Sequence, residues 1–151
     1  MKMYRRFLLG AITASMLAPA AFAQHLPVFY KTDGAAMAGY DAVSYFNGDA
    51  PVRGRPEYSV VWKGAEWHFA TPENRDAFEM NPRAYAPQFG GYCAYAMAQG
   101  ELVSTDPNLW QVIDGRLYLT HSPAIERMWE QDTSGFIRMA EANWPVILYE
   151  N

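Results

Sequence analysis

A pair of alternating segments joined at Lys63-Gly64 is the feature that most constrains what this chain can fold into. Apolar and polar side chains alternate on both sides of this dipeptide, and a period of two predicts β-strands. The dipeptide is typical of a tight turn, so the two strands are predicted to form an antiparallel hairpin. In the second strand Trp67 and Phe69 share one face, and His68 lies on the opposite one. With both aromatic rings in the core, His68 is available to a site on the other side of the sheet.

A second hairpin is predicted over residues 109–120, where Asp114-Gly115 separates two short apolar strands. Asp-Gly is a preferred two-residue turn because both of its residues need a positive φ. Residues 39–46 are rich in tyrosine, valine and phenylalanine, which predicts a further strand that ends at Asn47-Gly48. Residues 24–39 contain one proline and two glycines, and we expect them to be an irregular lead-in.

Helix signals lie between and after the hairpins. Thr71-Pro72-Glu73 combines a capping threonine, a proline at the first helical position and an acid in the first turn. We expect Phe78 to be the inward anchor of this helix and Asn81-Pro82 to end it. The alanine-rich segment Tyr92–Gln99 is predicted to be a helix with Gly100 as its C-cap, with a strand as the alternative.

Two more helices are predicted near the end of the chain. Ser122-Pro123 starts one of them. Its inner face is predicted to carry Ile125, Met128 and Trp129. Ser134 is predicted to cap the last helix, which runs through Asn143 and ends at Trp144-Pro145. Together the elements predict an α+β fold, in which two β-hairpins form a small antiparallel sheet packed with several short helices.

Residues 1–23 have the pattern of a cleavable secretory signal peptide. Lys2, Arg5 and Arg6 form a positive start, a short apolar run follows, and Ala21-Phe22-Ala23 is a cleavage signal. The apolar run is shorter than the roughly 20 residues that span a bilayer. We therefore expect a periplasmic or secreted protein with no stable membrane anchor after cleavage. The arginine pair leaves both the twin-arginine route and the ordinary export route open.

The charge and the cysteine content narrow the range of partners. The chain has 16 acidic and 12 basic residues, and loss of the signal peptide makes it more acidic still. A negative surface argues against nucleic acid and anionic membranes as partners. Cys93 is the only cysteine, so no internal disulfide can form. Cys93 is therefore a buried thiol, a metal ligand, a redox group or half of an intermolecular bridge in a homodimer.

Several short motifs match a known family. They are Tyr40-Asp41-Ala42-Val43, the hairpin with Lys63-Gly64 at its turn, the helix Glu73–Phe78, and Asn81-Pro82-Arg83-Ala84-Tyr85. Between Tyr40 and Pro87 the chain thus resembles the YHS domain, a small fold related to TRASH-type metal-binding modules. The tail, from Gly90-Gly91-Tyr92-Cys93-Ala94-Tyr95-Ala96 to Asn143-Trp144-Pro145, looks like the exported single-domain branch of that family. The resemblance implies a YHS-like domain over residues 40–151.

The resemblance also shows a departure from the metal-binding relatives. Those relatives carry cysteines at positions that align with Ser44, Ala70 and Asn74 of this chain. All three soft ligands are absent here, so the usual zinc or copper site of the family does not carry over to these positions.

Cys93, His68 and Met97 are the remaining candidate metal ligands. A spacing of four places Cys93 and Met97 on one face of either a helix or a strand. A thiolate, an imidazole and a thioether together form the soft ligand set that selects copper. The leading prediction is therefore a non-enzymatic copper-binding protein. His25, near the expected mature N-terminus, is a weaker candidate, and His121 is expected to be structural.

Two other functions remain open. Free cysteine is often a small buried hydrophobe, which would make the chain a metal-free interaction module or small-ligand-binding module. Alternatively, Cys93 and His68 form the nucleophile and base of a thiol-dependent enzyme. The chain has no Gly-x-Ser-x-Gly elbow, phosphate loop, dinucleotide fingerprint or His-Glu-x-x-His motif, and this favours a function other than catalysis.

Overall fold

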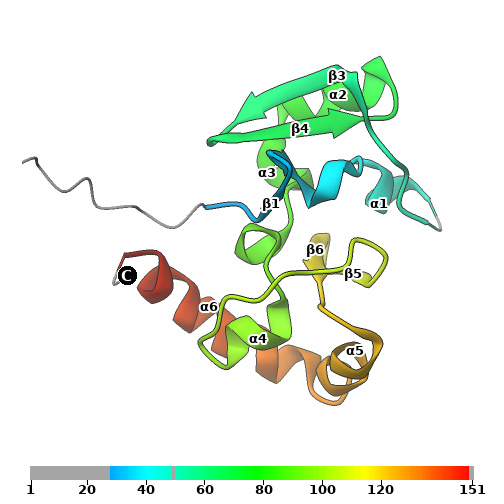
Figure 1. Ribbon diagram of the computed structural model, residues 1–151. Helices are drawn as coiled ribbons and strands as arrows, with labels where there is room; N and C mark the ends of the chain where they lie inside the picture. The colour runs from blue at the N-terminus through cyan, green and yellow to red at the C-terminus, as the bar shows by residue number, and fades with distance from the viewer. Residues whose placement is uncertain (1–27, 49, 150–151) are drawn as a thin grey trace, which may run out of the picture.

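The computed structural model describes residues 28–48 and 50–149, which form an α+β fold, as predicted. A small β-sheet with helix α2 lies at one end of the molecule, and helices α4, α5 and α6 lie at the other (Figure 1). The short hairpin β5–β6 lies between these two halves (Figure 1). The predicted signal peptide and His25 lie outside the described residues.

The first predicted hairpin is confirmed. Strand β3 (Arg55–Trp62) pairs antiparallel with β4 (Ala65–Phe69). The turn residues Lys63 and Gly64 have φ values of +48° and +75°, as a tight two-residue turn requires. Trp67 and Phe69 are buried, whereas the His68 side chain is on the other face and is 16% exposed. The alternation in the sequence therefore places the core face correctly.

The lead-in is not irregular throughout, because it adds two strands to this hairpin. Strands β1 (Lys31–Thr32) and β2 (Ala35–Ala36) pair antiparallel, and β2 pairs in parallel with β4. The sheet order is β1-β2-β4-β3. The turn between β1 and β2 is Asp33-Gly34, with φ values of +52° and +85°. It thus has the same chemistry as the Asp-Gly turn that predicted the second hairpin.

The second predicted hairpin is also confirmed, as a separate two-stranded sheet. Strands β5 (Trp110–Ile113) and β6 (Arg116–Leu119) pair around Asp114-Gly115, whose φ values are +50° and +72°. The sequence predicts that the two hairpins form one sheet, and this prediction is wrong, because they belong to two separate sheets. Strand β4 lies between β2 and β3, so the second hairpin cannot pair with it.

The prediction of a strand over residues 39–46 is wrong. A short 3-10 helix, η1 (Met37–Gly39), precedes this segment, and helix α1 (Ser44–Asn47) ends it. The Asp41 carboxylate oxygen Oδ1 accepts hydrogen bonds from the backbone N–H groups of Val43 (2.8 Å) and Ser44 (3.3 Å). These local hydrogen bonds to the Asp41 side chain favour a turn before α1 and outweigh the β-propensity of the neighbouring side chains.

The helix that follows the first hairpin begins and ends as predicted. Helix α2 (Pro72–Met80) is capped by Thr71, whose Oγ1 accepts a hydrogen bond from the Asn74 N–H at 3.1 Å. Phe78 is fully buried. The next elements are α3 (Pro82–Tyr85), the 3-10 helix η2 (Gln88–Gly91) and α4 (Ala94–Ala98). Gly100 follows α4 with φ +83°, which supports the predicted helix and its end.

The last two helices form as predicted, with Ser122-Pro123 at the start of the first, but one inward-facing residue and one cap differ from the prediction. Helix α5 (Pro123–Trp129) is capped by Ser122, but Met128 is 42% exposed and does not belong to the inner face. Helix α6 (Thr133–Tyr149) is capped by Asp132 rather than by Ser134, because Asp132 Oδ1 accepts from the Gly135 N–H at 3.0 Å. None of the described helices is long and apolar enough to cross a membrane.

Helix α6 continues through Pro145 instead of ending there. A proline inside a helix removes one N–H donor and usually kinks or stops the helix. Here Trp144 and Ile147, on either side of the proline, both pack against the hydrophobic cluster among the helices, which includes Met97, Trp129 and Ala140. This apolar packing offsets the lost backbone hydrogen bond, so tertiary contacts decide where the helix ends.

Strand β6 contributes side chains to both hydrophobic clusters of the protein. Leu117 and Leu119 belong to the cluster under the four-stranded sheet, and Tyr118 belongs to the cluster among the helices. All three side chains are buried. Since successive side chains of a strand point to opposite faces, β6 joins the two clusters directly.

Tyr45 links the two halves through a buried hydroxyl group. Its ring is 2% exposed and packs edge-on against Trp110, with ring centroids 5.3 Å apart. Its hydroxyl donates a hydrogen bond to the Pro107 carbonyl at 2.9 Å. Burial raises the pKa of Tyr45 far above its ordinary value. The folded state therefore holds this phenol neutral at a pH where an unfolded tyrosine ionises.

We expect the protein to lose stability above about pH 10, where the unfolded tyrosine releases its proton. The Y45F variant should lose about 1 kcal/mol at neutral pH, because the Pro107 carbonyl loses its donor. Its stability should then fall less steeply than that of the parent as the pH rises. Urea midpoints at neutral and alkaline pH measure both effects. An equal alkaline slope in Y45F and the parent would contradict the role of Tyr45. Burial also raises the pKa values of Tyr92 and Tyr118, so part of the slope should persist in Y45F.

Candidate functional site

Cys93 lies at the start of helix α4, where it is 1% exposed. Its backbone N–H donates to the Val103 carbonyl at 3.0 Å, and its carbonyl accepts from the Met97 N–H at 2.9 Å. Met97 is fully buried and belongs to the helical core cluster. Asn143 fixes this turn, because its side-chain amide donates to the Met97 carbonyl at 3.0 Å. The Met97 side chain thus packs in the hydrophobic core, one helical turn away from Cys93.

Cys93 lines a small cavity of about 160 Å³ that is also lined by His121. Apolar side chains from Val103 and Ile125 form part of the wall, and Glu101 is at the same cavity. His68 is not among the residues that line it. The structure therefore brings Cys93 together with the histidine that the sequence suggested was structural.

A hydrogen bond fixes the tautomer of His121. Its Nδ1 lies 3.0 Å from the Ser104 carbonyl oxygen and 3.2 Å from Ser104 Oγ. A carbonyl oxygen can only accept, so Nδ1 carries the proton and Nε2 carries the lone pair of the neutral ring. Such an arrangement is typical of histidines that bind metals, where the second nitrogen is held by a backbone carbonyl.

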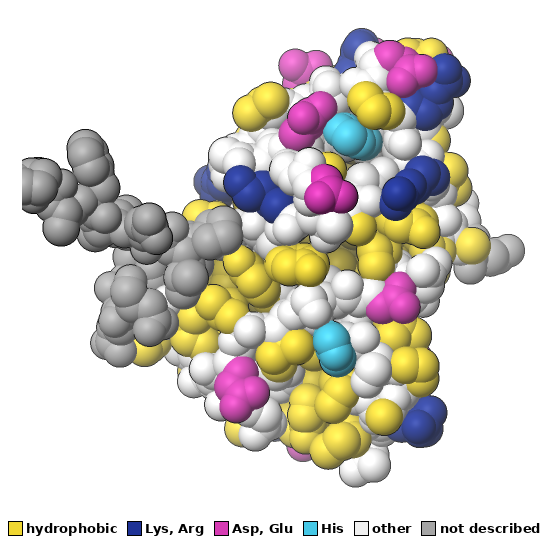
Figure 2. Space-filling model, in the orientation of Figure 1, with side chains coloured by type: hydrophobic (Ala, Val, Ile, Leu, Met, Phe, Trp, Pro, Cys, Tyr) yellow, Lys and Arg dark blue, Asp and Glu magenta, His cyan; other side chains and the backbone are white. Residues whose placement is uncertain are grey.

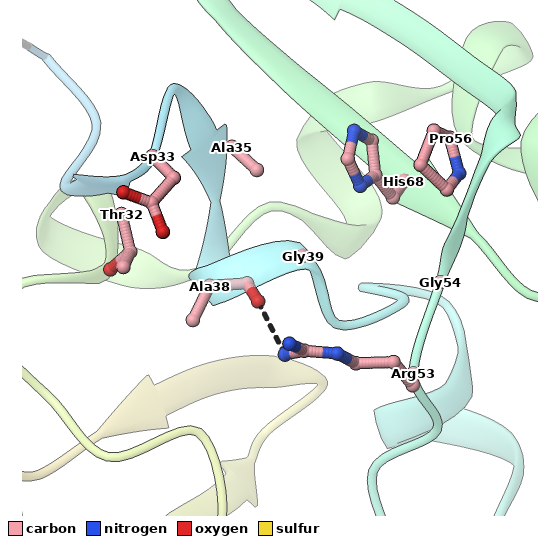
Figure 3. A pocket seen from close by; sticks show the side chains of 9 residues that line it. All are labelled: Thr32, Asp33, Ala35, Ala38, Gly39, Arg53, Gly54, Pro56 and His68. Atoms are coloured by element: carbon pink, nitrogen blue, oxygen red, sulfur yellow. Dashed lines mark hydrogen bonds between the residues drawn. The ribbon is translucent and has the colours of Figure 1, made fainter.

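His68 lies at a different place, in a hollow of about 330 Å³ on the outer face of the four-stranded sheet. Figure 3 shows its ring facing the turn between β1 and β2, with Gly39 below it. The two described histidines appear well apart on one face of the molecule (Figure 2). The sequence-based grouping of His68 with Cys93 thus does not correspond to a shared cavity.

Two glycines allow the chain to approach His68 closely. A Cβ atom placed on Gly54 would lie 2.5 Å from the backbone carbon and oxygen of His68. A Cβ on Gly39 would lie 3.4 Å from Nδ1 of the ring. The other ring nitrogen, Nε2, lies 3.0 Å from the Glu66 carboxylate. Backbone on one side and a carboxylate on the other therefore hold the imidazole in one orientation.

The hollow contains two charged groups that sequence reasoning missed. Asp33 comes from the β1–β2 turn, and Arg53 comes from the segment before β3. The Asp-Gly turn chemistry was a signal for the position of Asp33. No local pattern relates Arg53 to His68, because only the folded chain brings these segments together.

Ser44, Ala70 and Asn74 meet around one buried carboxylate, that of Asp41. Asp41 is fully buried, and its Oδ1 accepts from the Ser44 N–H. Its Oδ2 accepts from the Ala70 N–H at 2.9 Å and from the Asn74 side-chain amide at 2.7 Å. Each of these three residues donates at least one hydrogen bond to Asp41, and none of them is a soft ligand, so this set of residues does not fit a soft metal ion.

Within residues 28–48 and 50–149, no group of three or more His, Cys, Asp or Glu side chains is arranged to hold a metal ion. Any metal bound at Cys93 would therefore have few protein ligands.

A scan against protein-family models finds no matching family, and searches of curated proteins and of solved structures find no match either.

Proposed function

We propose that this chain is an exported YHS-type domain that binds a soft metal ion, with copper in its Cu(I) state as the best candidate, at Cys93 and His121. One observation carries the metal site: the only cysteine of the chain lines the same small cavity as a histidine with a fixed tautomer. Thiolate and imidazole are the ligands that favour copper over the hard cations. The resemblance of residues 40–151 to the YHS domain and the signal-like residues 1–23 support the class and the export.

The surroundings of Cys93 suit a soft ion better than a reactive thiol. In the described part of the chain, no hydrogen bond joins the Cys93 sulfur to His121, whereas a nucleophile and its base are normally within such reach. A metal ion between a thiolate and an imidazole instead holds the two groups about 4 Å apart. Glu101 at the same cavity adds a negative charge that favours a cation over a free thiolate.

Competition for Cu(I) against a chromophoric chelator tests the proposal. We expect C93S to lower the affinity by about 100-fold and H121Q by about tenfold, because each removes one ligand. H68Q is the matched control, since its imidazole lies in the other hollow and its loss should leave the affinity unchanged.

The outcomes separate the remaining alternatives. Equal competition by the parent, C93S and H121Q would exclude the site and leave Cys93 as a structural residue. A loss in H68Q without a loss in H121Q would restore the grouping of Cys93 with His68 that the sequence suggested. Thermal melts of all variants without metal show whether a lost affinity reflects lost folding.

A further inference from the structure

The hollow beside His68 contains one guanidinium and one carboxylate that are not paired with each other. Arg53 and Asp33 both line it, and neither takes part in an ion pair within the described residues. In Figure 3 the two side chains come from different sides of the hollow, and the His68 ring lies on a third side. Three polar groups from three segments thus surround one open space.

Arg53 is held in place before any ligand arrives. Its Nη1 donates to the Ala38 carbonyl at 2.7 Å, and its guanidinium carbon lies 5.0 Å from the centre of the Tyr40 ring. A guanidinium has five N–H donors, so the bond to Ala38 leaves donors for a ligand. A positioned guanidinium with spare donors is suited to a carboxylate, which it can bind through two hydrogen bonds.

Asp33 and His68 provide the complementary groups. Asp33 is exposed in the β1–β2 turn, and Thr32 lines the same hollow. An ionised carboxylate accepts hydrogen bonds and attracts a cation. His68 presents Nε2 to Glu66, which leaves Nδ1, near Gly39, as the nitrogen with the lone pair of the neutral ring. Both groups are acceptors for an ammonium group.

We propose that this hollow binds a small zwitterion of the α-amino acid class. The ligand carboxylate accepts hydrogen bonds from the Arg53 guanidinium, and the ligand ammonium group lies between Asp33 and His68. This site is independent of the metal site, since the two cavities share no lining residue.

Charge and size together select this ligand class. The charges of Arg53 and Asp33 sum to zero, so a zwitterion satisfies both. A simple anion would leave Asp33 unpaired and repelled, and a simple cation would do the same to Arg53. The volume of about 330 Å³ is near the lower end for small-molecule sites. A single amino acid fits this volume.

Titration of the full chain, followed by backbone amide NMR shifts, tests the proposal with three matched probes. L-alanine carries both charged groups, propionate carries only the carboxylate, and ethylamine carries only the amine. We expect L-alanine, or another neutral α-amino acid in a panel, to bind at least about tenfold more tightly than either half. The shifted amides should include those of Gly39, Gly54 and His68. Binding of no neutral amino acid, or equally tight binding of propionate, would overturn the proposal.

Two substitutions with matched controls locate the site. R53Q and D33N should each lower the affinity for the amino acid by about tenfold or more, because each removes one charge. D33N preserves the turn, since asparagine also tolerates a positive φ. D114N changes the other Asp-Gly turn in the same way, and R138Q removes an exposed arginine elsewhere. Unchanged binding in R53Q and D33N, or equal losses in the controls, would contradict the assignment.

Discussion

The D41A substitution is expected to lower the free energy of unfolding by about 4 kcal/mol. The Asp41 side chain is fully buried and accepts hydrogen bonds from four N–H groups. Alanine would leave three of these donors without their partner, whereas the Ser44 N–H keeps its bond to the backbone carbonyl of residue 41. Each buried unpaired donor costs about 1–3 kcal/mol before the structure relaxes. The donors belong to α1, to the residue after β4 and to α2, so the loss would loosen three elements at once. Urea unfolding of D41A and the parent measures the difference.

Two further variants show whether the effect comes from the buried carboxylate. D76A removes an exposed carboxylate that pairs with Arg75, and it should cost no more than about 1 kcal/mol. D41N keeps the shape but turns one acceptor oxygen into a donor that faces N–H groups, so it should retain most of the loss. A D41A value close to that of D76A would show that the Asp41 hydrogen bonds contribute little.

The hairpins and most helix starts were predictable because their signals are local. A period of two, an Asp-Gly or Lys-Gly turn and a capping side chain before proline each act within a few residues. The misjudged elements depend on competition between such signals or on distant contacts. Hydrogen bonds to Asp41 favour a helical turn in a segment whose side chains have high β-propensity. Packing of Trp144 and Ile147 allows α6 to continue beyond Pro145.

The candidate sites show the same division. Alternation in β4 predicted that His68 faces away from the core, and the structure agrees. Which residue would accompany it could not be predicted, because Asp33, Arg53 and His68 come from three separate segments. The sequence grouped Cys93 with His68, whereas the structure places it at a cavity with His121, to which no local sequence pattern relates it. Residue chemistry was predictable from the sequence, whereas the grouping of residues required the fold.

The G90A substitution is the second change for which we expect a large effect, a loss of about 3–4 kcal/mol in the free energy of unfolding. Gly90 has φ +61°, and a Cβ there would overlap the Val28 carbonyl oxygen and lie 3.0 Å from the Trp144 ring. Its carbonyl also accepts from the Tyr30 N–H at 2.8 Å. The substitution would therefore push the segment before β1 away from η2 and disturb the packing of α6.

G115A is the matched control, because it isolates the contact with Val28 from the cost of the backbone conformation. Gly115 has φ +72°, and a Cβ there would meet no atom within 4 Å. Alanine in this left-handed conformation should cost about 1–2 kcal/mol at either position. The excess loss in G90A, about 2 kcal/mol, then measures how firmly the segment around Val28 and Tyr30 is attached. Equal losses in G90A and G115A would mean that this segment moves aside easily, and that β1, which follows it, contributes little to the stability of the sheet.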